Sequence, residues 1–261
     1  GWLFVRASVW LDVLPVWLAI AGSTLEGAVF RYQIIEWNTR RLKERFERYV
    51  SPEVAAQLGS DREIELGGQR RRVSVLFADL RGFTRFAEGL PPERTLAVLN
   101  RHLRIMSDAV LQHGGTLDKF TGDGLMAFFG APLAAHDHAS RALRAAAAML
   151  SGIERIDAPR LPIGIGIHTG DVVVGNIGSD RRLEYTAIGD TVNVAARLEE
   201  AAEAGEILVS EETHAAGGDL PGWHYRQPES LTLKGRRSPL SCRRLVRDDS
   251  GRRHPRESAS G

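Results

Sequence analysis

The most distinct hydrophobic pattern in the chain runs from Val73 to Ala78, where Ser74 is the only polar residue. A run without alternation between polar and apolar positions is typical of a strand that is buried on both faces. Asp79 ends the run, and a carboxylate at the end of a buried strand is costly unless it is paired or binds a metal. The Gly-containing turn Arg81–Thr84 follows and could present backbone N–H groups to an anion. The pattern therefore predicts a metal at Asp79 with phosphate groups beside it.

Two short apolar segments further along the chain predict a hairpin. Residues 116–120 and 125–129 are expected to be its strands, and the four residues Thr-Gly-Asp-Gly between them are typical of a turn. If this hairpin lies beside the first strand, Asp79 and Asp123 come close together and can share two divalent ions. Either aspartate alone would be assigned to a strand end or a turn, so the metal site depends on the pair.

The remaining periodicity predicts helices between the strands. We expect helices over 91–113, 138–153 and 191–204, and a long strand region over 161–188 followed by short strands. The order strand, helix, strand, strand, helix, strand is the ferredoxin-like pattern. The sequence therefore predicts an α+β domain over residues 70–247.

The N-terminal part of the chain predicts a membrane segment over residues 1–30. Residues 13–30 contain Glu26 as their only ionisable residue, and a helix of this length spans roughly 27 Å, close to a hydrocarbon core. Trp10 and Trp17 would be interfacial anchors, and residues 1–5 could end a preceding span. A buried helix of a soluble protein is the alternative at this marginal length.

A helical linker for dimerisation or signal transmission is expected over residues 31–69. Ile35, Leu42, Phe46 and Tyr49 form a narrow apolar stripe, for which a second copy of the chain is the simplest partner. Basic residues outnumber acidic ones between residues 40 and 48, which places this side in the cytoplasm by the positive-inside rule. A plain spacer is the alternative.

Composition narrows the class of protein. The chain has 261 residues, is 43% hydrophobic and carries a net charge of +1, so it can form a full core and gives no indication of nucleic-acid binding. A single cysteine, Cys242, excludes an intramolecular disulfide and fits a reducing compartment. Because the first residue is Gly1, we expect a missing upstream region such as a sensor domain. Residues 248–261 are expected to form a disordered tail.

Three ordered motifs resemble the class III nucleotidyl cyclases, the adenylate and guanylate cyclase family. They read Phe-Ala-Asp-Leu-Arg-Gly-Phe-Thr, Lys-Phe-Thr-Gly-Asp-Gly-Leu-Met-Ala-Phe-Phe-Gly and Glu-Tyr-Thr-Ala-Ile-Gly-Asp-Thr-Val-Asn-Val-Ala-Ala-Arg-Leu-Glu. The similarity runs from about residue 73 to about residue 246. It implies a ferredoxin-like cyclase domain, preceded here by the expected transmembrane helix and linker. The implied reaction converts ATP to cyclic AMP and pyrophosphate by attack of the 3′-OH on the α-phosphate.

The resemblance assigns roles to individual residues. Asn193 and Arg197, four apart on one helix face, would hold the ribose and the charge of the transition state as catalytic residues. Asp79, Leu80 and Asp123 would bind two Mg²⁺ or Mn²⁺ ions in each site. Substrate contacts are expected from Gly82, Phe83, Thr84, Lys119, Thr186 and Lys234.

Base selection depends mainly on Lys119, whose ammonium has three donors and no acceptor. Adenine N1 accepts a hydrogen bond whereas guanine N1 donates one, so Lys119 favours ATP. Thr186 occupies the second purine-reading position of the family, but a hydroxyl can donate or accept and does not discriminate strongly. A threonine here resembles a bacterial subgroup of adenylate cyclases, some of them responsive to bicarbonate.

The family divides each active site between two subunits, with the metal carboxylates on one and the base-reading and transition-state residues on the other. This chain has both sets, so the resemblance implies a homodimer with two equivalent sites, held at the cell membrane with its catalytic domain in the cytoplasm. A guanylate cyclase and a catalytically silent module that only dimerises and relays a signal are the alternatives. A diguanylate-type cyclase is disfavoured, because its Gly-Gly-Asp/Glu-Glu-Phe hairpin is replaced by Thr-Gly-Asp-Gly.

Overall fold

The computed structural model describes residues 2–4, 10–12, 67–179, 182–232 and 239–248. The chain divides into two compact units, Gly1–Gly59 and Ser60–Gly261. In the first unit, β1 (Trp2–Phe4) pairs antiparallel with β2 (Trp10–Asp12). Strands are therefore found at Trp10, one of the two predicted interfacial anchors, and within the predicted end of a preceding span, whereas Trp17 lies outside the described residues. The predicted span over 13–30 lies outside the described residues, as does most of the linker. Within the described ranges, no helix has both the length and the apolar character to cross a membrane.

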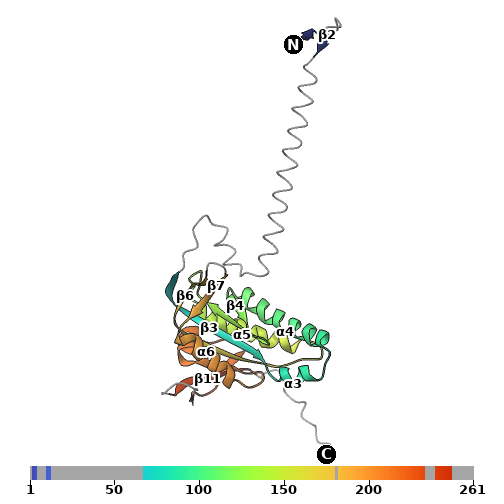
Figure 1. Cartoon of the computed structure of the whole chain (residues 1–261). Helices are drawn as coiled ribbons and strands as arrows, with labels where there is room; N and C mark the ends of the chain where they lie inside the picture. The colour runs from blue at the N-terminus through green and yellow to red at the C-terminus, as the bar shows by residue number, and fades with distance from the viewer. Residues whose placement is uncertain (1, 5–9, 13–66, 180–181, 233–238, 249–261) are drawn as a thin grey trace, which may run out of the picture. The chain divides into compact units, whose positions relative to one another are not determined.

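The second unit alternates strands and helices as Figure 1 shows. Its elements, in chain order, are β3 (Gly67–Leu80), α3 (Phe83–Glu88), α4 (Pro92–Gln112), β4 (Thr116–Phe120), β5 (Gly124–Phe129), α5 (His138–Glu154), β6 (Ile163–Ser179), β7 (Arg182–Ile188), α6 (Asp190–Ala201), β8 (Ile207–Ser210), α7 (Glu211–Gly217), β9 (Trp223–Tyr225), β10 (Glu229–Leu231) and β11 (Leu240–Arg247).

The strands of this unit form one sheet, which has nine strands among the described residues. Its order is β10-β11-β8-β6-β3-β5-β4, with β7 on β6 and β9 on β11. The four strands β6, β3, β5 and β4 are antiparallel to one another, whereas β6 is parallel to β8 on its other side. With α4 and α5 these four strands form the ferredoxin-like arrangement that the sequence predicts. The strand that carries Asp79, β3, therefore lies inside the sheet between β6 and β5.

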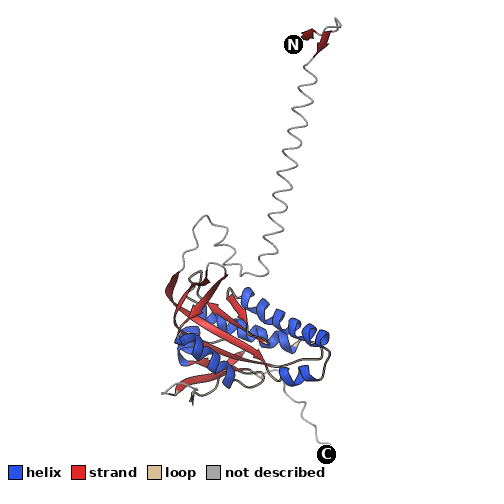
Figure 2. Cartoon of the chain, viewed as in Figure 1, coloured by secondary structure: helices blue, strands red, loops and turns tan. Residues whose placement is uncertain are grey.

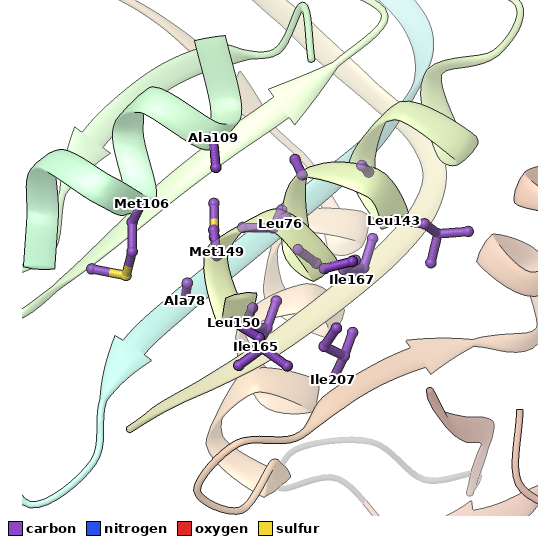
Figure 3. Close-up of a cluster of buried hydrophobic side chains, with 14 of the residues drawn as sticks. Leu76, Ala78, Met106, Ala109, Leu143, Met149, Leu150, Ile165, Ile167 and Ile207 are labelled. Atoms are coloured by element: carbon purple, nitrogen blue, oxygen red, sulfur yellow. The ribbon is translucent and has the colours of Figure 1, made fainter. Parts of the chain in front are cut away.

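Helices cover both faces of the sheet (Figure 2). On one face, α4 and α5 pack on β3 and β6 around a cluster that includes Leu76, Met106, Met149 and Ile165 (Figure 3). On the other face, Val73, Val75, Phe128 and Val174 pack with Ala195 of α6. Residues 73–76 are each 0% exposed, which confirms the predicted two-sided burial of the strand.

Several element boundaries differ from the predicted ones. The linker was expected to continue to residue 69, but β3 begins at Gly67 because it pairs along its full length with the equally long β6, from Gly67 opposite Asn176 to Leu80 opposite Ile163. The strand region predicted over 161–188 is a hairpin of two strands, β6 and β7. The third predicted helix, α6, ends at Ala201 rather than at residue 204.

The predicted disordered tail begins one residue too early. The backbone N–H of Asp248 donates a hydrogen bond to the carbonyl of Gly222 over 2.9 Å, and its carboxylate lies 2.6 Å from Nδ1 of His224. These contacts continue the edge formed by β11 and β9. Residues 249–261 lie outside the described residues.

Candidate active site

The structure brings Asp79 and Asp123 together at one end of the central strands. Asp79 is opposite Gly124 in the ladder of β3 and β5, and the backbone N–H of Leu80 points to the carbonyl of Asp123 at 3.4 Å. Burial and the neighbouring Asp123 carboxylate raise the pKa of Asp79 to about 6, although Arg81 acts in the opposite direction. Two adjacent carboxylates repel each other, and a divalent cation between them would remove that repulsion.

Two glycines of the β4–β5 turn allow this approach. Gly122 has φ 89°, a left-handed conformation that a glycine adopts without strain. A Cβ at Gly124 would lie 2.5 Å from Oδ1 of Asp79 and would also touch the carbonyl of Ala78. Only a residue without a side chain leaves room for the Asp79 carboxylate at this position.

The oxygen atoms at this end of the sheet suit a hard cation that binds substrate at its remaining ligand positions. Asp79 and Asp123 supply two carboxylates, and Leu80, which is 2% exposed, is the last residue of β3. The described ranges contain no group of three or more His, Cys, Asp or Glu side chains that could hold a metal ion. Mg²⁺ commonly uses one or two carboxylates together with substrate phosphates and water, so the pair fits such an ion.

Arg81 links the aspartate end of β3 to helix α6, a connection that the sequence analysis missed. Its Nη1 lies 2.7 Å from Oε1 of Glu199 and 3.7 Å from Oδ2 of Asp79. Its Nε donates to the carbonyl of Ala202 over 3.1 Å, and Nη2 donates to the carbonyl of Glu199. Gly164 of β6 makes room for this guanidinium, because a Cβ there would collide with it. Burial raises the pKa of Glu199 to about 7, although Arg81 lowers it.

The residues after Arg81 form the start of a helix rather than the turn that the sequence predicts. Gly82 is the N-cap of α3 with φ 76°, and Phe83 and Thr84 are the first two residues of the helix. Phe83 also packs against the core under α4 and α5. Gly82, Phe83 and Thr84, for which the sequence predicts substrate contacts, therefore lie at the N-terminus of a helix that begins shortly after Asp79.

A second group of polar residues joins β4 to β7. Lys119 Nζ lies 3.2 Å from Asp118 Oδ1 and 3.6 Å from Glu184 Oε2. The hydroxyl of Thr186 donates to Asp118 Oδ2 over 2.5 Å. Burial alone would lower the pKa of Lys119, but the two carboxylates outweigh it and raise the pKa above its ordinary value. The structure thus brings together Lys119 and Thr186, the two predicted base-reading residues, through Asp118.

A β-bulge explains why Asp118 was missed. The register of β4 against β5 shifts between Leu117 and Lys119, so Asp118 is the extra residue. In a regular strand Asp118 and Lys119 would point to opposite faces, yet here both reach β7. The available signal was the position of Asp118 directly before Lys119, but strict alternation argues against their acting together.

The two predicted catalytic residues lie on the outward face of α6. Val194, Ala195 and Leu198 are buried against the sheet, whereas Asn193 is exposed and Arg197 is partly exposed. The guanidinium of Arg197 donates to both carboxylate oxygens of Glu200 on the same helix, at 2.7 and 2.6 Å. Arg197 thus points away from the core of its own chain.

Two further observations complete the placement of the predicted site. Lys234 lies outside the described residues. A pocket lined by Arg71, Arg72, Gly130 and His138, among others, lies at the other end of β5 from Asp79 and contains none of the predicted site residues.

Comparison with known proteins identifies the second unit. Residues 68–243 match the family model of the adenylate and guanylate cyclase catalytic domain. An uncharacterised protein of Mycobacterium tuberculosis is 36% identical over 201 residues, which are 76% of this chain and 37% of that protein. A second uncharacterised protein of the same organism is 36% identical over 202 residues, 77% of this chain and 35% of that protein. The chain thus spans little more than a third of the length of these curated relatives.

Two solved structures resemble this chain to a similar degree, although one is named a guanylyl cyclase and the other an adenylyl cyclase. The guanylyl cyclase Cya2 is 37% identical with a TM-score of 0.66, covering 72% of this chain and 98% of that one. The adenylyl cyclase CyaB from P. aeruginosa is 39% identical with a TM-score of 0.64, covering 71% of this chain and 98% of that one. Overall similarity therefore leaves the choice between ATP and GTP to the residues of the site.

Proposed function

Because the chain belongs to the family of adenylate and guanylate cyclase catalytic domains, we propose that it converts ATP to 3′,5′-cyclic AMP and pyrophosphate. In this reaction the 3′-OH of the ribose attacks the α-phosphate, and pyrophosphate leaves on the opposite side. The protein needs to align these groups and to stabilise the charge that develops on the phosphate oxygens.

The observation that supports ATP as the substrate is that Lys119 and Thr186 both contact the carboxylate of Asp118. The side chain of Lys119 is 43% exposed, so its ammonium can reach a ligand while it stays paired with Asp118. An ammonium is a donor only, which suits the N1 acceptor of adenine and opposes the N1–H of guanine. A guanylate cyclase remains the second candidate, because Cya2 is nearly as similar to this chain as CyaB.

We propose that Asp79 and Asp123, with Leu80, hold two Mg²⁺ or Mn²⁺ ions when nucleotide binds. The ions would lower the pKa of the attacking hydroxyl and neutralise charge on the phosphates. The chain itself would keep the two carboxylates adjacent, and the absence of a side chain at Gly124 leaves room for this. Arg81 places a positive charge near Asp79. The N-terminus of α3 and Lys234 are assigned to the phosphates.

We propose that the active form is a homodimer in which Asn193 and Arg197 of one chain complete the site formed by Asp79 and Asp123 of the other. The outward position of Arg197 on α6 is compatible with a role in a partner's site. Exposed apolar residues near Thr186 also favour an interface: Phe120 is 50%, Val173 44% and Ile188 55% exposed, and the last two are paired between β6 and β7. Glu200 would then release Arg197 as the partner's site forms.

We further propose that residues 13–30 tether the catalytic domain to the cytoplasmic side of the cell membrane. The proposal rests on the apolar character of this segment and the basic residues after it. Recovery of the chain in the membrane fraction, with release after deletion of residues 1–30, is the expected result. A chain that stays in the soluble fraction would contradict it.

The reaction is tested by a product assay with ATP and GTP in parallel, in Mg²⁺ and again in Mn²⁺. The Asp123→Ala variant is the blank, since its fold is expected to persist without a metal site. Cyclic AMP from ATP with little cyclic GMP is the expected result. Cyclic GMP as the main product would favour the guanylate cyclase. No product from a verified dimer would favour the silent relay module.

A further inference from the structure

The side chain of Asp118 is almost fully buried, unlike that of an ordinary surface aspartate. Its side chain is 1% exposed, and both oxygens are engaged, one by the Lys119 ammonium at 3.2 Å and one by the Thr186 hydroxyl at 2.5 Å. A buried carboxylate is costly unless it is paired and hydrogen-bonded, and here both conditions are met by the two residues assigned to the purine base. The shorter of these two contacts is the hydrogen bond from Thr186.

The hydrogen bond to Asp118 determines which role the Thr186 hydroxyl can still play. A hydroxyl has one proton to donate and two lone pairs that accept. An ionised carboxylate only accepts, so the proton of Thr186 is committed to Asp118. The lone pairs that remain make Thr186 an acceptor for any ligand. An ambiguous side chain thereby becomes a selective one.

We propose that Asp118 is a specificity-determining positioning residue, which makes Thr186 an acceptor for the 6-amino group of adenine. With Lys119 as the donor to N1, the pair presents one donor and one acceptor, which match adenine at both positions. Guanine presents a donor at N1 and an acceptor at C6, so it is mismatched at both. This inference rests on the proposed cyclase function, and it adds a residue that touches neither the base nor the phosphates.

The bulge in β4 is the structural device that makes this possible. It lets two consecutive residues, Asp118 and Lys119, reach the same neighbouring strand. On β7, Glu184 and Thr186 are two residues apart and share a face, so each meets one member of the consecutive pair. The geometry therefore connects the two base-reading residues by a single buried carboxylate.

The Asp118→Asn variant tests the proposal because it reverses the hydrogen bond without changing shape. Lys119 can only donate, so the amide oxygen of Asn must face Lys119 and the amide NH₂ must face Thr186. The hydroxyl of Thr186 then accepts from the amide, and its proton is free for the acceptor at C6 of guanine. We expect the ratio of kcat/KM for ATP to that for GTP to fall about tenfold, the effect of one exchanged hydrogen bond.

Two matched variants separate this mechanism from a general disturbance. Glu184→Gln also removes a carboxylate beside Lys119 but keeps the hydrogen bond from Thr186 to Asp118, so it should leave the ATP/GTP ratio within about twofold of the wild type. In a Thr186→Val background, Asp118→Asn should have no further effect on the ratio, because the hydroxyl through which it acts is absent. An equal shift in Glu184→Gln, or an undiminished shift in the Thr186→Val background, would overturn the proposal.

A second set of measurements tests the proposal even if Asp118→Asn does not fold or the enzyme shows no turnover. Thr186→Val should itself reduce the preference for ATP whereas Thr186→Ser should keep it, since serine retains the hydroxyl that donates to Asp118. Binding of 3′-deoxy-ATP and 3′-deoxy-GTP, which lack the attacking hydroxyl, reports base preference without turnover. If wild-type protein makes cyclic AMP but Thr186→Val keeps the wild-type ratio, this inference fails alone. If wild-type protein prefers GTP or binds neither analogue, the proposed function fails with it.

Discussion

At the scale of the residue, Asp79 and Asp123 are the pair of side chains that we propose to hold the metal ions. They come from different segments of the chain and meet only because β3 pairs with β5. We expect Asp79→Asn and Asp123→Asn each to lower turnover by at least about 10³-fold, because each removes a charge from the site that would hold the ions.

The control for this prediction is Asp108→Asn, which removes an exposed carboxylate of α4 that lies outside the site. Cyclase rates at saturating metal, measured on protein whose oligomeric state has been checked by light scattering, give the comparison. Retained turnover in either aspartate variant would contradict the assignment of the metal site.

Cys242, the only cysteine in the sequence, gives a residue-scale prediction about reactivity. It is 0% exposed, and burial together with Glu229 raises the pKa of its thiol to about 11. Since the thiolate is the reactive form, we expect the native protein to react with Ellman's reagent at pH 8 at least about a hundredfold more slowly than the protein in guanidinium chloride. Equal rates in the two conditions would show that β11 is not packed as described.

Some residues of the candidate site can be found from the sequence and others only from the structure, and the reason is physical. Asp79, Asp123 and Lys119 stand at strand ends or within a recognisable hairpin, so local pattern and family resemblance lead to them. Asp118 acts through a bulge, and Arg81 acts through contacts with Glu199 and Ala202, more than a hundred residues away. Strand periodicity and turn composition carry no signal for either kind of contact.

At the scale of the element, α6 depends on glycines of the strand beneath it. Gly166 of β6 faces the helix so closely that a Cβ would touch the backbone of Ala195 and Glu199. The hydrophobic pattern predicts the strand but carries no signal for how near a helix comes to it. The close approach sets the position of Asn193 and Arg197, because α6 carries both.

We therefore expect Gly166→Ala to lower the free energy of unfolding by about 2 kcal/mol, since the added methyl group must push the helix away from the sheet. Gly89→Ala is the matched control, because a Cβ at Gly89 would have no neighbour within 4 Å. Urea unfolding followed by circular dichroism measures both. A Gly166→Ala variant as stable as Gly89→Ala would show that α6 is not held this closely.

Element order was predictable because it follows from periodicity, whereas element ends were not. The extension of β3 to Gly67 depends on its pairing with β6. Helix α6 ends at Ala201, and the carbonyl of the next residue, Ala202, accepts a hydrogen bond from Arg81. Both ends are set by tertiary contacts between distant segments. The residues that decide them lie far from the ends themselves.

At the scale of the whole molecule, the proposed division of each active site between two chains can be tested by mixing. A chain with Asp79→Ala and a chain with Arg197→Ala should each be inactive as homodimers. In an equal mixture, half of the dimers are heterodimers, and each has one site in which both residues are intact. We expect about a quarter of wild-type activity to return.

The mixture is compared with each variant alone at the same total concentration, and heterodimers are verified by two affinity tags. No recovery in verified heterodimers would place all residues of a site in one chain. The fold of the domain was predicted from the order of strands and helices, and the strand order β6-β3-β5-β4 agrees with it. The division of each site between two chains stays a prediction.

The β4–β5 hairpin has one more consequence for such a dimer. Lys119 lies on the hairpin and Asp123 at its turn, four residues apart, yet under the proposed division they serve different active sites. Under that proposal, we expect a nucleotide that shifts Lys119 in one site also to shift Asp123 in the other. Saturation by ATP should then follow a Hill coefficient other than one, while heterodimers with a single intact site should follow a simple hyperbola. In the proposed dimer, a few residues of backbone would join the two active sites, and we expect binding of nucleotide at one site to affect the other.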